Sequence, residues 1–181
     1  MTVDVLVSCP AWTADLPDAV GLAENAIGAA AAMAFRRAGR FEVSVLLTDD
    51  ATQRRLNRTW RGQDRATNVL AFPAQTRAAL DDLRVGGPTT GLGDVVLAHG
   101  TVRREAEAQG KALADHMSHL LVHGFLHLIG YEHEAVGEAE RMEALEVRVL
   151  GRLGIADPYA GEATAGANRY EGAVPDERAR R

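Results

Sequence analysis

The sequence predicts one domain of the α/β (α+β) class, in which a small mixed β-sheet of about four strands packs against helices. Short apolar runs with strand periodicity alternate with longer segments of helical periodicity. The chain has 181 residues, of which 46% are hydrophobic and 25% charged, as expected of one globular domain. We expect this domain to cover residues 1–156. Residues 157–181, rich in Gly, Ala, Glu, Pro and Arg, are predicted to be a disordered tail.

The strands are predicted from short β-branched and apolar runs bounded by turn residues. The four segments are 3–7, expected at a sheet edge, 41–48, 67–72 and 93–98. Pro73 is expected to stop the third of these segments. The glycine-containing segment 73–92 is predicted to be a surface loop.

The helices are predicted from apolar periodicity and from capping residues. The segments are 15–38, 50–60, 101–109, 111–129 and 135–153. Asp49 is a suitable N-cap for the second segment, and Gly130 is a natural C-terminal stop for the fourth.

Composition limits the possible functions. Cys9 is the single cysteine, which excludes an internal disulfide and a thiolate zinc cluster, so a metal site would have to use histidine and carboxylate. The net charge of −5 does not indicate nucleic-acid binding, although it says little about local patches. The first residues lack the features of a signal peptide, and no uncharged stretch is long enough to span a membrane. We therefore expect a cytoplasmic protein.

The segment HMSHLLVHGFLHLIGYEHE, residues 116–134, carries the strongest chemical signal. His116, His119, His123 and His127 fall within one sector of the predicted helix, and apolar side chains occupy its other faces. His116 is expected at the surface. His119 is a candidate either for a competing metal ligand or for a group that orients a ligand or faces the substrate.

His123 and His127 are four residues apart, which lets two ring nitrogens reach one metal ion. Gly130 allows a sharp turn that can bring His133 back as a third ligand. Three histidines leave a fourth position for water, as in catalytic zinc sites, where the pKa of bound water can fall to about 7. We predict one Zn²⁺ ion here, although imidazole sites also bind nickel, copper and iron.

The spacing H-x-x-x-H-x-x-G-x-x-H is that of metzincin proteases. Those enzymes carry a glutamate general base directly after the first histidine, where this chain has Gly124. This difference argues against ordinary peptide hydrolysis.

Three segments together resemble the YbeY family of bacterial rRNA maturation factors and metal-dependent endoribonucleases. They are HGFLHLIGYEH, LNRTWRGQDRATNVLAFP at 56–73 and LGDVVLA at 92–98. The family usually has aspartate where this chain has Glu132. Order and spacing also match, over residues from about 40 to 135.

The resemblance implies an α/β fold with the metal helix beside a small sheet, and three histidine ligands for zinc. It implies action on single-stranded RNA in processing the end of small-subunit rRNA and in ribosome quality control, with the ribosome or its proteins as partners. It also points to Arg61 as a catalytic or RNA-binding residue, so Arg61 and His123 are our candidate catalytic residues. A surface arginine at a helix end is the plainer interpretation of Arg61.

Other residues are weaker candidates. The arginines between 54 and 65 could form a basic, RNA-contacting surface or simply a solvated helix face. Trp60 could stack on a base or pack into the core. Asp94 is expected to orient a ligand histidine through its second ring nitrogen.

Two further functions stay open at this point. The first is a metalloprotease, as the metzincin-like spacing suggests. The second is a non-catalytic ribosome-assembly factor in which zinc only stabilises the fold.

Overall fold

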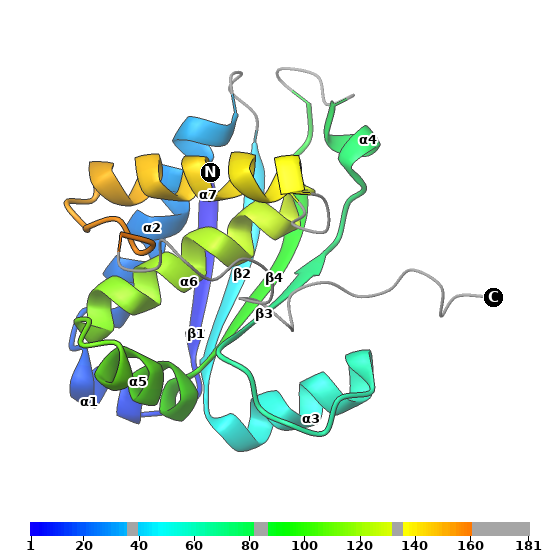
Figure 1. The fold of residues 1–181 in the computed structure, drawn as a ribbon. Helices are drawn as coiled ribbons and strands as arrows, with labels where there is room; N and C mark the ends of the chain where they lie inside the picture. Colours follow the sequence, from blue (N-terminus) through cyan, green and yellow to red (C-terminus); the bar gives the residue numbers. More distant parts are fainter. Residues whose placement is uncertain (36–39, 82–86, 132–135, 161–181) are drawn as a thin grey trace.

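The computed structural model describes residues 1–35, 40–81, 87–131 and 136–160. Its centre is a four-stranded sheet of order β1-β2-β4-β3 (Figure 1). The strands are β1 (Thr2–Val7), β2 (Phe41–Thr48), β3 (Val69–Pro73) and β4 (Thr90–Ala98). The first two neighbouring pairs are parallel, whereas β3 is antiparallel to β4. The predicted mixed sheet is confirmed, including the place of β1 at an edge.

Helices connect and cover the strands. They are α1 (Ala11–Asp15), α2 (Ala19–Ala34), α3 (Asp50–Arg61), α4 (Arg77–Asp81), α5 (His99–Ala108), α6 (Leu113–Leu128) and α7 (Val136–Arg152). Two predictions need correction. The segment 15–38 does not form one helix, because the chain leaves α1 before Pro17 and α2 begins only at Ala19. The predicted loop 73–92 contains α4, whose first turn is capped by the Thr76 hydroxyl, which accepts the Ala79 N–H.

The sheet presents one apolar face to the helices. Along β2, Val43, Val45 and Leu47 are buried, whereas the alternating Glu42 and Ser44 are exposed. Helices α2 and α6 lie on the apolar face, and α7 packs across both of them (Figure 1). Helix α6 is therefore the middle layer, and each large apolar side chain that it buries contributes roughly 1.5–3 kcal/mol.

Gly124 marks the closest approach of α6 to the sheet. A Cβ atom at this position would lie 2.8 Å from Val95 Cγ1 and 3.2 Å from Val69 Cγ2. Any larger side chain would push α6 away from β3 and β4. The glutamate that a metzincin carries at this position would meet the same two valines, so glycine at position 124 has a steric reason.

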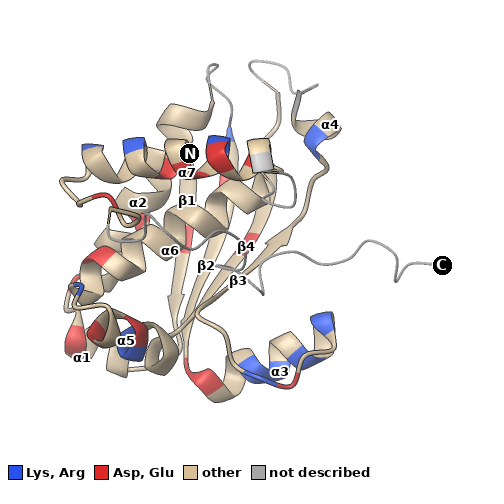
Figure 2. Cartoon of the chain, in the orientation of Figure 1, with Lys and Arg blue, Asp and Glu red and all other residues tan. Residues whose placement is uncertain are grey.

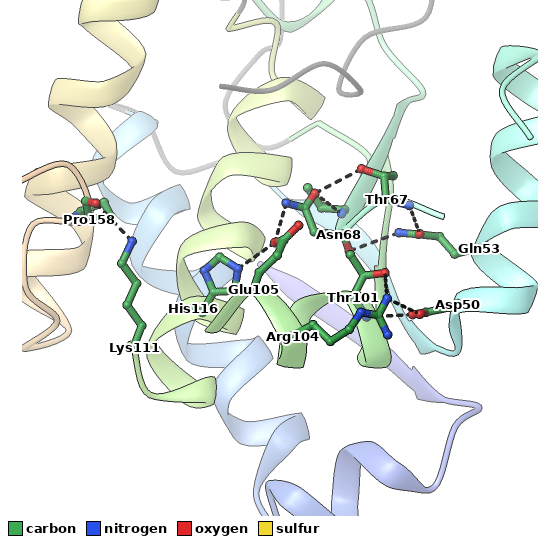
Figure 3. Close-up of polar contacts among 11 residues, drawn as sticks. Asp50, Gln53, Thr67, Asn68, Thr101, Arg104, Glu105, Lys111, His116 and Pro158 are labelled. Carbon is green, nitrogen blue, oxygen red and sulfur yellow. Dashed lines mark hydrogen bonds and ion pairs between the residues drawn. The ribbon is translucent and has the colours of Figure 1, made fainter. Parts of the chain in front are cut away.

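Helix α3 is fixed at both ends. The Asp49 carboxylate accepts the Thr52 N–H at 2.6 Å, which confirms the predicted N-cap, and the helix ends at Gly62 with φ of 68°. Buried side chains hold the loop that follows. Gln53 donates to the Asn68 carbonyl at 3.2 Å (Figure 3). Asn57 donates to the Arg65 carbonyl at 2.7 Å. The loop from α3 to β3 is thus tied to α3 itself.

None of the helices in the described part of the chain has both the length and the apolar character needed to cross a membrane.

Candidate metal centre

The histidines of α6 are buried between protein layers. Every residue from His116 to Leu128 is buried. Side chains three or four residues apart share one face of a helix, so the four histidines lie on one face of α6. This face is directed at α5 and α7 rather than at the sheet. The ring centroids of His119 and His123 are 6.5 Å apart, and those of His123 and His127 are 4.6 Å apart. The predicted imidazole stripe is present, inside the molecule.

His123 and His127 direct the same ring nitrogen at each other. Their Nε2 atoms are 3.1 Å apart. Two nitrogens bound at 2.0–2.1 Å to one tetrahedral zinc ion lie about 3.4 Å apart. The pair therefore fits two ligand positions of one metal ion with a small adjustment of the side chains.

The third predicted ligand, His133, lies outside the described residues. Among the residues that are described, no three His, Cys, Asp or Glu side chains are grouped so that they could hold a metal ion. Three-histidine ligation stays a prediction, for which the structure describes two members.

Glu146 of α7 is the carboxylate beside this pair. It is 1% exposed. Its Oε1 is 2.8 Å from His123 Nδ1, and its Oε2 is 3.1 Å from His119 Nε2 and in hydrogen-bond contact with the Tyr159 hydroxyl. A buried carboxylate next to a ligand histidine is the arrangement that orients imidazoles in zinc proteins.

The charge state of Glu146 follows from these contacts. Burial by itself would raise the pKa of the carboxyl group, but the hydrogen bonds from His119 and His123 outweigh burial and hold this pKa far below its ordinary value. For His119, burial is the largest effect and lowers the pKa of the ring, against the opposing effect of Glu146. Both pKa directions agree with a hydrogen bond in which the Glu146 carboxylate accepts from His119.

His116 and His119 both have carboxylate partners. The expectation that His116 lies at the surface is wrong: it is 4% exposed, and its Nε2 is 3.0 Å from Glu105 Oε2. The same oxygen of Glu105 accepts the Asn68 side-chain amide at 3.0 Å (Figure 3). His116 thus links α6 to α5 and to the start of β3. His119 turns its Nε2 to Glu146, as expected of a group that supports a ligand.

Asp94 makes no hydrogen bond to any histidine in the part of the chain that the structure describes. Its neighbour Val95 and the alternate Leu97 are buried in the core under α6, so Asp94 is directed to the opposite, exposed face of β4. The carboxylate that contacts a predicted ligand histidine is Glu146, at His123 Nδ1.

Arg61 lies in the last turn of α3. Its Nη2 donates to the Ala71 carbonyl of β3 at 3.1 Å, and its guanidinium carbon is 5.9 Å from the centre of the Phe72 ring. Burial lowers the pKa of Arg61 to about 10. Strand β3 also packs against α6, so it is the element that connects Arg61 with the histidine helix.

The other arginines of α3 are at the surface (Figure 2). Arg54 makes a two-pronged contact with Asp64, with both N–O distances at 2.8 Å, although both side chains are more than half exposed. Trp60 is 65% exposed, and its ring meets the Phe72 ring in an edge-to-face arrangement with centroids 6.5 Å apart. Trp60 is thus not a core residue.

Glu146 and Tyr159 are the site residues that the sequence reasoning missed. Glu146 stands within an apolar stripe of α7 that includes Met142, Leu145 and Val149, all buried. A carboxylate inside such a stripe predicts a buried polar contact, because a buried charge needs hydrogen-bonding partners. Tyr159 belongs to residues 157–160, which had been assigned to the tail but form a turn in the structure.

Most of the chain is similar to known proteins. The family model described as "Endoribonuclease YbeY" matches residues 14–154. Curated relatives named Endoribonuclease YbeY include one from a Bradyrhizobium species, 49% identical, covering 88% of this chain and 92% of the relative. Another, from Paramagnetospirillum magneticum, is 49% identical and covers 88% of this chain and 97% of the relative.

A solved structure supports the fold. The solution structure of TM1509 from Thermotoga maritima is similar with a TM-score of 0.52 and 22% identity, covering 92% of this chain and 99% of that chain. At this identity the likeness concerns the fold alone.

Proposed function

The chain belongs to the YbeY family of endoribonucleases, and from this premise we propose that it cleaves single-stranded RNA with the help of one zinc ion. As a member of this family it is an enzyme, a hydrolase that acts on RNA. We further propose that its substrate is ribosomal RNA. It would process the end of small-subunit rRNA and act in ribosome quality control in the cytoplasm, with the ribosome or ribosomal proteins as partners.

One observation carries the metal part of this proposal. The Nε2 atoms of His123 and His127 converge at 3.1 Å while the other nitrogen of His123 is held by a buried carboxylate. A pair of imidazoles oriented in this way is the donor set that zinc prefers. His123, His127 and His133 would hold the ion. When bound, zinc supplies Lewis-acid chemistry, which polarises phosphoryl oxygens and lowers the pKa of water.

Arg61 supplies positive charge for the phosphodiester. With a pKa of about 10, its guanidinium is protonated at neutral pH although it is partly buried. Its contact with the Ala71 carbonyl fixes one nitrogen and limits the motion of the group. A fixed planar guanidinium can stabilise the negative charge that gathers on phosphate oxygens in the transition state.

Two nucleophiles are compatible with this arrangement, water and the ribose 2′-hydroxyl. The products distinguish them, because only attack by the 2′-hydroxyl leaves a cyclic phosphate. Peptide hydrolysis is the less favoured activity, since Gly124 stands where a metzincin carries the protease base.

The experiment measures bound metal in the purified protein and then cleavage of single-stranded RNA, duplex RNA and casein. His127→Ala and Arg61→Ala test the proposed residues. Arg148→Ala is the matched arginine control, because Arg148 is exposed on α7 and donates only to its own helix at Ala144.

We expect zinc-dependent cleavage of single-stranded RNA that His127→Ala abolishes, that Arg61→Ala strongly reduces and that Arg148→Ala leaves unchanged. Undiminished RNA cleavage by a folded, metal-free His127→Ala protein would contradict the proposal. Zinc that stabilises the fold without any RNA cleavage would favour the structural role of the metal.

A further inference from the structure

Glu146 is an unusual residue for its position on α7. It occupies a place in the apolar stripe of the helix and is 1% exposed, with Leu145 and Leu150 buried beside it. Removing a carboxylate from water costs several kcal/mol unless buried partners compensate. An apolar residue here would join α7 to α6 without this cost, so a fold requirement alone does not explain a carboxylate.

The contacts of Glu146 define the state of three neighbouring groups. The oxygens of a carboxylate accept hydrogen bonds. The contacts of Oε1 with His123 Nδ1 and of Oε2 with His119 Nε2 and the Tyr159 hydroxyl are therefore those of an acceptor with three donors. A neutral imidazole that carries its proton on Nδ1 presents a lone pair at Nε2. In His123 this is the nitrogen that faces His127 at 3.1 Å.

The segment after α7 completes the group from another side. The Tyr159 ring meets the His119 ring edge-on, with centroids 5.6 Å apart, and its hydroxyl reaches Glu146. Two backbone contacts hold this segment: Asp157 accepts the Tyr159 N–H at 2.8 Å, and Lys111 donates to the Pro158 carbonyl at 3.2 Å (Figure 3). Tyr159 is therefore placed by the chain around it, and with His119 it restrains the second oxygen of the carboxylate.

We propose that Glu146 is a positioning residue for the metal centre, which holds His123 in the Nδ1–H tautomer so that its Nε2 is available to the metal ion. Tyr159 and His119 support Glu146 by fixing its orientation. The inference rests on the proposed function for the existence of the metal. It adds a residue of α7 and the segment 157–160 to a centre otherwise built from α6 and the region after it.

The competing explanation is purely structural, in which Glu146 only joins α6 to α7. Both explanations predict that loss of Glu146 destabilises the fold. They differ in the affinity for metal at a given degree of folding, whereas the tautomer of His123 tests the contact on which the inference depends.

The first test uses the metal-free, full-length wild-type protein. Long-range ¹H–¹⁵N correlation spectra of histidine rings distinguish the two neutral tautomers, and the signals of His123 are assigned by their loss in His123→Asn. We expect the Nδ1–H tautomer. A His123 ring protonated at Nε2 and bare at Nδ1 would overturn the inference, whatever the activity of the enzyme.

The second test measures zinc affinity by competition with a chelator for Glu146→Gln and for Tyr159→Phe. The matched control is Glu140→Gln, an exposed glutamate of the same helix. Loss of a partner behind a ligand histidine typically weakens metal binding by about 10- to 100-fold, which we expect for Glu146→Gln, with Tyr159→Phe at the lower end. The control should bind zinc as the wild type does.

Outcomes of this test separate the two proposals. If the wild type binds zinc and cleaves RNA but both variants bind zinc equally well, the inference fails and the proposed function stands. If the wild type binds no zinc, the proposed function fails in its metal part and the inference fails with it, even where His123 has the Nδ1–H tautomer. Should Glu146→Gln not fold, Tyr159→Phe, which loses only a hydroxyl, decides the affinity question.

Discussion

Two polar regions of the molecule are built in opposite ways. The histidine cluster consists of the four histidines of α6 and Glu146 of α7, and the arginine surface consists of Arg54, Arg55 and Arg58 of α3. In the first, a carboxylate that is 1% exposed accepts hydrogen bonds from fixed partners. In the second, the ion pair between Arg54 and Asp64 joins side chains that are 57% and 51% exposed. Exposed pairs of this kind contribute about 0–1 kcal/mol, whereas breaking a buried pair costs several kcal/mol.

The difference indicates two different tasks. A metal ion requires ligand atoms held to within tenths of an ångström, which buried and fully hydrogen-bonded side chains provide. A phosphate backbone can be contacted by mobile surface charges. Arg61 is intermediate, since it comes from the exposed helix yet is partly buried and fixed to β3.

Removing a predicted ligand from the buried cluster should have the largest effect. We expect His123→Asn to abolish zinc-dependent RNA cleavage and to weaken zinc binding by more than the roughly 100-fold that a residue behind a ligand can cause. Metal content by mass spectrometry and cleavage of labelled RNA measure this. Retained stoichiometric zinc in the folded variant would remove His123 from the ligand set.

The Arg61→Ala variant tests whether this residue of α3 takes part in catalysis or only in the surface that contacts RNA. Loss of one positioned group that stabilises transition-state charge typically lowers kcat by about 100- to 1,000-fold, and we expect this of Arg61→Ala. Zinc affinity should change less than in His123→Asn, because the described contacts of Arg61 are with the Ala71 carbonyl and the Phe72 ring of β3. A normal kcat with a raised KM would reassign Arg61 to RNA binding.

Gly124 tests how tightly the buried cluster depends on the packing of α6. An added methyl group meets Val95 at 2.8 Å, and overpacking typically costs about 1–3 kcal/mol, more than the roughly 1 kcal/mol that alanine gains over glycine in a helix. Gly124→Ala should therefore lower the free energy of unfolding.

The matched control is Gly28→Ala in α2, where a Cβ would meet no atom within 4 Å. This substitution should stabilise the protein slightly in the same urea titration. If both variants gained stability, the close contact of α6 with the sheet would be wrong.

Acidification should affect the buried cluster of the metal-free protein. Burial lowers the pKa of His119 below that of the unfolded chain, about 6.5, so the unfolded state binds more protons in this range. The stabilising contribution of a neutral His119 is thus complete above pH 6.5 and declines as the pH falls below it. Urea titrations at pH 7.5 and 5.5 should show a smaller decline for His119→Gln than for the wild type.

The smallest effect is expected at the arginine surface. Arg54→Ala should change the free energy of unfolding by less than about 1 kcal/mol, since its pair with Asp64 is exposed. If the surface contacts RNA, the slope of log affinity against log salt should fall by about 1. An unchanged slope would exclude Arg54 from the RNA interface.

Local patterns predicted much of this molecule. The N-cap Asp49, the helix stop at Gly130, with φ of 81°, and the edge position of β1 follow from local chemistry and strand order. The apolar residues around the imidazole stripe predicted that α6 packs into the core, but they did not predict the burial of His116. These features depend on residues within a few positions of one another.

Contacts between segments far apart in the sequence were harder to predict. The contact of Glu146 with His123 spans 23 residues and depends on how α7 crosses α6. Strand alternation places Asp94 on the face opposite Val95, so the sequence pattern itself argues against a contact between Asp94 and the histidine helix. Tyr159 follows a composition typical of a tail, and only the folded chain brings its hydroxyl to Glu146.

X-ray absorption spectroscopy of the zinc-loaded, full-length protein tests the three-histidine centre most directly. We expect one ion per chain, with a first shell of three imidazole nitrogens and one oxygen, and loss of one imidazole in His127→Ala. A shell made mainly of carboxylate oxygens, or an imidazole count unchanged by His127→Ala, would contradict a metal centre built from His123, His127 and His133.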